Sequence, residues 1–223
     1  MANSNHLVIS YMTIRRAIGV LGICLTVVLA ISSYITKSCP HIQESISHYY
    51  YTKMGDVFVG ILCAVGLFLI TYKGYKNDRI FTNIAGIFAL GIAFFPTSNI
   101  EDVLCRLYYL EPSKWKETIH YVSAALFFVT LAYISVFLFT KSTGEKTLEK
   151  IYRNRIYRVC GIVMIVSIIM IAVFHFLLGE DFKNSFHHYK PVFWLESLAL
   201  WAFGISWLVK GEVILADDDK KEK

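Results

Sequence analysis

Six long apolar runs limit the folds that this chain can adopt. A helix needs about 20 apolar residues to cross the ~30 Å hydrocarbon layer of a bilayer. With 56% hydrophobic and 17% charged residues, the composition is also too apolar for an ordinary soluble domain. The runs occupy residues 17–35, 57–72, 80–95, 121–140, 159–178 and 192–209.

We therefore predict an all-α, multi-pass membrane protein with six transmembrane helices in one domain, residues 1–223. The second and third runs are short, so flanking tyrosines, lysines and an arginine must extend them. The first run follows Arg15 and Arg16 and has the small residues Ser32 and Ser33 near its end, as in a secretory signal. We interpret it as a true helix, because it is long for a signal and because five spans would separate the two termini.

The 22 Lys and Arg residues are unevenly distributed between the two sides of this topology. An inside N-terminus puts 15 of them in the cytoplasmic segments and 7 in the outer loops. Cytoplasmic segments usually carry this excess, so both termini are predicted to be cytoplasmic. The same bias explains the net charge of +5, and no nucleic-acid partner is predicted. The outer loops are residues 36–56, 96–119 and 179–191, and the cytoplasmic segments include a basic loop, 141–158, and a charged tail, 210–223.

Six of the seven histidines fall in the outer loops or at the outer helix ends. Histidine titrates near neutral pH and is a common metal ligand, but its ring also suits the lipid headgroup region. The spacings HExxH and HxxxH are absent, so a divalent metal such as zinc would need ligands from separate helices. We leave that cofactor open. The six are His41, His48, His120, His175, His187 and His188.

Glu196 is the most informative single residue, because it lies about five residues inside the last run, roughly 7–8 Å deep. An ionisable side chain there needs a partner or a polar cavity, although a structural hydrogen bond between helices would also explain it. His120 begins the fourth run, with Ser123 one turn further on. We predict that His120 and Glu196 are a catalytic acid/base pair if the protein is an enzyme.

Other polar residues are predicted to complete an outward-opening pocket around this pair. His175 lies near the outer end of the fifth run, and Asp56 begins the second, where it could instead simply favour the helix N-terminus. The stretch 45–60 would form the rim, with Ser47 and His48 in contact with substrate. We expect Ser47, His48, Asp56, Ser123 and His175 to bind substrate.

The cysteines divide by topology into three within helices and two in outer loops. Disulfides form on the oxidising, outer side of a membrane. We therefore predict a disulfide between Cys39 and Cys105.

The order of these features resembles the six-helix membrane family that includes the DRAM and Sfk proteins and the Golgi proteins that remodel the lipid of GPI anchors. In that family, motifs lie before the second helix, in the fourth helix and in the last helix. His48 stands where the family has an acidic residue. The matching positions here are Pro40, Ile46, Ser47 and His48, then His120, Ser123, Ala124, Phe127 and Phe128, then Glu196. The resemblance implies a lipid-handling role on the non-cytoplasmic leaflet.

The function expected from the sequence is recognition or modification of a membrane lipid or lipid-linked headgroup, by a lipid hydrolase or acyl-transfer enzyme if the protein is catalytic. The alternative is a non-enzymatic regulator, assembly partner or small transporter in which the same residues are structural. The expected location is an integral, multi-pass position in a membrane, which is the inner or plasma membrane if the source is bacterial.

Overall fold

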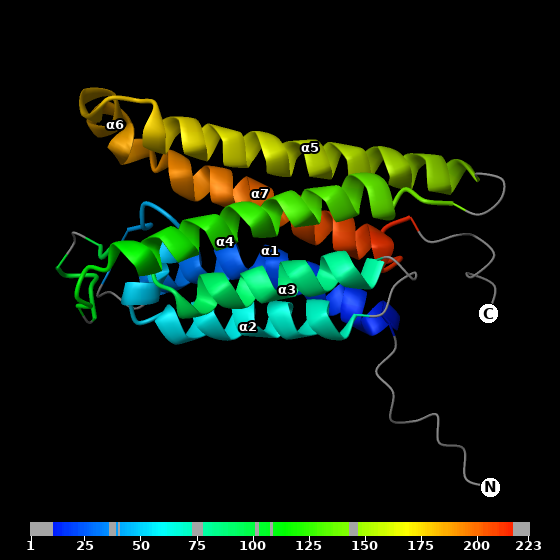
Figure 1. The fold of residues 1–223 in the computed structure, drawn as a ribbon, viewed down its shortest axis with the longest axis horizontal. Helices are drawn as coiled ribbons and strands as arrows, with labels where there is room; N and C mark the ends of the chain where they lie inside the picture. The colour runs from blue at the N-terminus through cyan, green and yellow to red at the C-terminus, as the bar shows by residue number, and fades with distance from the viewer. Residues whose placement is uncertain are drawn as a thin grey trace, which may run out of the picture.

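The computed structural model describes residues 11–35, 39, 41–72, 78–100, 103–107, 109–142 and 147–215. Within these ranges the regular structure is entirely helical, and long helices lie side by side in one bundle (Figure 1). The fold class predicted from the sequence is therefore confirmed as all-α. The long helices are α1 (Tyr11–Ile35), α2 (Gly55–Thr71), α3 (Asp78–Phe94), α4 (Lys114–Tyr133), α5 (Leu148–Phe176) and α7 (Pro191–Lys210).

Four stretches of the described chain are long and apolar enough to cross a membrane: Met12–Ser32, Lys114–Leu138, Leu148–Phe176 and Pro191–Lys210. The helix that contains the fourth apolar run continues from α4 into a π-helical segment, η3 (Ile134–Leu138). Gly55–Thr71 and Arg79–Phe94 are shorter apolar helices, each about 25 Å long at 1.5 Å per residue. These helices are consistent with a membrane protein, while the six-span topology and its orientation stay predictions.

The helix α5 has an apolar surface that the rest of the bundle leaves uncovered. Val159, Ile162, Val166 and Ile169 are all exposed on it, and Figure 1 shows α5 along one edge of the bundle. A helix with so much exposed apolar surface is poorly suited to water and well suited to lipid.

The two ends of the bundle differ in what they contain. At one end the beginning of α1 meets the end of α7, where the Arg16 side chain donates to the carbonyl oxygen of Gly211 at 2.9 Å. The other end, which we call the loop end, is where α1, α3 and α5 finish and α2, α4 and α7 begin. The candidate site lies at the loop end.

The loop end has more helical structure than the sequence predicts. Residues 179–191, expected to be a loop, contain α6 (Glu180–Phe186) and a 3-10 turn, η4 (His187–Tyr189). Acidic residues in the first turn, Glu180 and Asp181, stabilise the N-terminus of α6. A second 3-10 turn, η2 (Ser47–Tyr51), precedes α2.

Glycines allow two pairs of helices to cross with their backbones in contact. A Cβ atom added to Gly86 of α3 would lie 2.6 Å from the carbonyl oxygen of Gly66 in α2. One added to Gly204 of α7 would lie 2.6 Å from the carbonyl oxygen of Gly19 in α1. Small residues promote this close approach in membrane helices. The second crossing fixes α7 in the bundle, two turns away from Glu196.

Candidate functional site

A cavity of about 780 Å³ at the loop end is lined by most of the predicted site residues. Its walls come from α4, α5 and α7, with η2 and the α6 region at the polar side. The polar lining includes Ser47, His48, His120, Lys183, Lys190 and Glu196. The apolar lining includes Ala124, Ala125, Phe128, Ile168, Ile171 and Ala172. The cavity is therefore amphipathic, with chemically reactive groups at its polar part.

Ser47 and His120 form a hydrogen-bonded pair within this cavity. The Nε2 atom of His120 lies 2.9 Å from the Ser47 hydroxyl oxygen, and its Nδ1 atom lies 2.7 Å from the carbonyl oxygen of Phe95. A carbonyl only accepts, so Nδ1 carries a hydrogen and donates. In the neutral ring, Nε2 then accepts from the Ser47 hydroxyl. The pair has the arrangement of a nucleophile, a base and a group that orients the base.

The helix α7 holds the segment that carries Ser47. Its Glu196 carboxylate accepts a hydrogen bond from the backbone N–H of Ile46 at 2.6 Å. The backbone N–H of Phe193, in the first turn of α7, donates to the carbonyl oxygen of Glu44 at 2.9 Å. The Phe193 N–H has no acceptor within its own helix, so its bond to Glu44 satisfies the first turn of α7. The bond from Ile46 to Glu196 satisfies the backbone N–H of the residue before Ser47.

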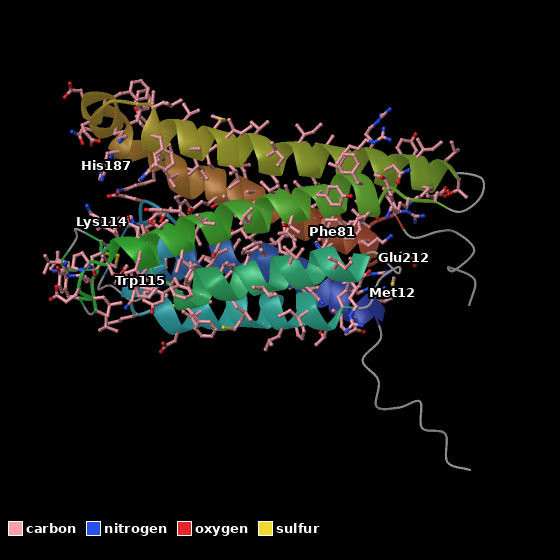
Figure 2. The ribbon with its side chains drawn as sticks, viewed as in Figure 1. Met12, Phe81, Lys114, Trp115, His187 and Glu212 are labelled. Atoms are coloured by element: carbon pink, nitrogen blue, oxygen red, sulfur yellow. A yellow bond between two sulfur atoms is a disulfide. The ribbon has the colours of Figure 1, made fainter. Side chains whose placement is uncertain are left out.

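Charged side chains surround the polar side of the cavity. Glu44 forms a short contact with His187, and its carboxylate lies 3.8 Å from the Lys190 ammonium. Lys183 pairs with Glu180 at 2.8 Å. Figure 2 shows His187 at the loop end, where α6 folds back toward α7. Acidic and basic side chains are thus paired with one another at this rim.

His48 is held in its neutral form by its surroundings. Burial lowers the pKa of His48 to about 4, and this effect outweighs the opposing attraction of Glu44. The neighbouring His120 and Lys190 lower the pKa further. At neutral pH His48 is therefore an uncharged hydrogen-bonding group in the cavity wall.

Five of the seven predicted catalytic and substrate-binding residues line the cavity, and two do not. Ser47, His48, His120, His175 and Glu196 all contribute to it. Ser123 is buried against α3 instead, since a Cβ atom on Gly91 would lie 2.5 Å from its hydroxyl oxygen. Asp56 is exposed in the first turn of α2, which matches the alternative of a favourable N-terminal charge.

The sequence did not reveal which residues are hydrogen-bonded to each other. It paired His120 with Glu196, whereas the described hydrogen bonds join His120 to Ser47 and Glu196 to Ile46. Ser47 and His120 are 73 positions apart in the chain, and no local motif connects them. Glu44, Lys183 and Lys190 were also not predicted.

The predicted disulfide is present, with Cys39 and Cys105 bonded at 2.06 Å between their sulfur atoms. His41 lies beside it, with its Nε2 atom 3.6 Å from the Cys105 sulfur, so the three residues together have the atom types of a metal site. Metals bind thiolates, and the disulfide uses both sulfurs. The oxidised pair therefore fits a structural link rather than a metal centre.

A second, smaller cavity of about 330 Å³ lies beneath the segment between α3 and α4. Its lining includes Tyr51, Asn99, Arg106 and Glu117. None of the predicted catalytic or substrate-binding residues lines it.

The fold and the cavity together define a class: an all-helical bundle with apolar helices of membrane-spanning length and an amphipathic cavity at one end. No family model, curated protein or solved structure matches the chain. The resemblance to the DRAM- and Sfk-like family therefore stays a prediction, and one of its positions, Pro40, lies outside the described residues.

Proposed function

We propose that this protein is a multi-pass membrane protein that binds and modifies a lipid or lipid-linked headgroup in the cavity at the loop end. The observation that carries the proposal is the division of the cavity lining. Apolar side chains of α4 and α5 line one part of it, and hydroxyl, imidazole, carboxylate and ammonium groups line the other. A ligand with a long apolar chain and a polar end matches this division.

The proposed topology puts the cavity in the outer leaflet. The excess of Lys and Arg at the opposite end of the bundle supports a non-cytoplasmic loop end, and the Cys39–Cys105 disulfide at the loop end supports the same orientation. A lipid in this leaflet would have its headgroup at the depth of Ser47 and its chain beside α4 and α5.

The experiment tests whether the cavity holds a lipid. The protein is purified in a mild detergent, and co-purifying lipids are extracted and identified by mass spectrometry. Ala124→Trp adds an indole ring to the apolar lining, so we expect it to lower the amount of bound lipid at least tenfold. Ile169→Trp puts the same ring on the exposed face of α5 and should leave bound lipid unchanged.

Equal lipid in the two variants would contradict the proposal, as would wild-type protein without a stoichiometric lipid. A lipid that binds but is never chemically altered would identify the non-enzymatic regulator that the sequence leaves open.

A further inference from the structure

We infer that Ser47 is the nucleophile of an acyl-transfer reaction on a carboxylic ester lipid, with His120 as its general base. This inference deepens the proposed function and rests on it. It also replaces the pairing of His120 with Glu196 by a pairing of His120 with Ser47, and it gives Glu196 a positioning role.

The first argument is the geometry of the pair. The 2.9 Å separation between the Ser47 oxygen and the His120 Nε2 atom is within the range for proton transfer between a nucleophile and its base. The Phe95 carbonyl holds the hydrogen on Nδ1, which leaves the Nε2 lone pair directed at the serine hydroxyl. His120 is only 2% exposed, so its ring has little freedom to leave this orientation.

The second argument is the position of the pair relative to the apolar lining. His120, Ala124 and Phe128 are spaced four residues apart, so they follow one face of α4, and all three line the cavity. An acyl chain lying along this face beside Ala124 and Phe128 would bring its carbonyl carbon to the level of His120. The ester bond would then be next to the Ser47 oxygen.

The reaction has two balanced steps. The Ser47 oxygen attacks the ester carbonyl carbon while its proton moves to His120 Nε2, and the bond from that carbon to the alkoxy oxygen breaks. The leaving alcohol takes the proton from His120, and the acyl group stays on Ser47 as an ester. In the second step water, or the hydroxyl group of a second lipid, gives its proton to His120 and attacks the acyl-serine. The bond from the acyl carbon to the Ser47 oxygen then breaks, and the Ser47 oxygen takes the proton back from His120. The acyl group leaves as a carboxylic acid or a new ester, and both Ser47 and His120 return to their starting forms.

The test uses an alkyl fluorophosphonate, which phosphonylates activated serine hydroxyls. Wild-type protein in detergent is incubated with the probe, digested and analysed by mass spectrometry. We expect a single adduct on the peptide that contains Ser47. Ser47→Ala should abolish it, and His120→Gln should slow its formation at least 100-fold, within the range of general-base effects.

Matched controls separate loss of chemistry from loss of structure. Ser185→Ala and His188→Ala change an exposed serine and an exposed histidine near α6 that do not line the cavity, and both should be labelled at the wild-type rate. If Ser47→Ala fails to fold, Ser47→Cys provides a second test. If His120 is the base, the thiol of the Ser47→Cys variant should react with iodoacetamide at pH 7 at least tenfold faster than the same thiol in the Ser47→Cys/His120→Gln double variant.

An unmodified Ser47 in wild-type protein would overturn the inference, as would equal labelling rates in wild type and His120→Gln. The proposed lipid function is tested separately by the Ala124→Trp measurement. Bound lipid with an unreactive Ser47 would refute only the serine chemistry, whereas a reactive Ser47 without bound lipid would refute the lipid function.

Discussion

Replacement of Glu196 tests how the bundle positions the segment that carries Ser47. The Glu196 carboxylate accepts the N–H of Ile46 at 2.6 Å, and Ile46 is only 3% exposed, so water cannot readily take over this bond. Glu196→Gln keeps one acceptor oxygen and replaces the ionisable carboxyl group with a neutral amide, whose NH2 group donates. Glu196→Leu has a similar size and removes the acceptor.

The two replacements should differ in free energy of unfolding. A hydrogen bond to a charged group contributes about 1.5–3 kcal/mol and a neutral one about 0.5–1.5 kcal/mol. We therefore expect a loss of about 1 kcal/mol for Glu196→Gln. Glu196→Leu leaves the Ile46 N–H unpaired but no longer buries a carboxyl group, so the net loss should be about 2–3 kcal/mol. With 2–4 °C per kcal/mol for a chain of this size, the melting temperatures should fall by about 3 °C and about 6–9 °C.

The assay is thermal unfolding in detergent together with fluorophosphonate labelling of Ser47. Glu196→Leu should slow labelling at least tenfold, because Ile46 directly precedes Ser47, while Glu196→Gln should change the rate only a few-fold. Glu111→Gln is the control, since Glu111 is exposed and does not line the larger cavity. If both Glu196 variants are equally destabilised, or if Glu196→Leu labels at the wild-type rate, Glu196 does not position the Ser47 segment.

Four further predictions address the rest of the structure. Non-reducing mass spectrometry of digested protein should find the Cys39 and Cys105 peptides linked, and Cys105→Ser should lower stability by up to about 4 kcal/mol; two alkylatable thiols in unreduced protein would refute the link. Gly204→Leu should cost about 1–3 kcal/mol of stability by overpacking against α1. Gly60→Ala, with open space around it in the interior of α2, replaces glycine with a better helix former and should lose no stability; equal losses in the two variants would exclude the close crossing. The folded state keeps His48 neutral down to about pH 4, with Glu44, His120 and Lys190 around it, while an unfolded histidine gains its proton near pH 6.5. The free energy of unfolding should therefore fall as the pH drops from about 6.5 to about 4. A His48→Gln variant with the same pH profile of stability as wild type would contradict this origin. Membrane-impermeant thiol reagents applied from outside should reach cysteines placed at Ser113 and Asn184. They should not reach cysteines placed at Asn77 or Thr143, two positions outside the described residues. Labelling at position 77 would overturn the predicted orientation.

The depth of residues along the helices could be predicted from the sequence, but the rotation of the helices could not. Hydropathy marks each apolar run and the polar segments that bound it, so the level of His120, His175 and Glu196 followed from counting residues. Rotation is harder, because a helix in lipid can be apolar on every side and shows little amphipathic pattern. Ser123 lies near the predicted depth but faces α3, and Asp56 is exposed on α2.

Local sequence also cannot predict contacts that depend on distant elements. The disulfide could be predicted because the topology left only two cysteines in outer loops. The bond between Ile46 and Glu196 joins residues 150 positions apart, and it depends on how α7 packs against α1. The serine–histidine pair depends in turn on that packing, on the η2 turn and on the Phe95 carbonyl at the end of α3.

The contact between the first and last long helices has a consequence for biogenesis. Arg15 and the backbone of Lys210 meet although they are 195 positions apart, and ribosomes add about 5–20 residues per second. The helix α1 therefore waits about 10–40 s in the membrane before its partner is made. A nascent chain that ends before α7 contains Ser47 and His120 but lacks the helix that orders residues 44–47. Reactivity at Ser47 should thus appear only after the ribosome has completed and released the last helix, which makes such reactivity a reporter of completed insertion in a cell-free translation reaction.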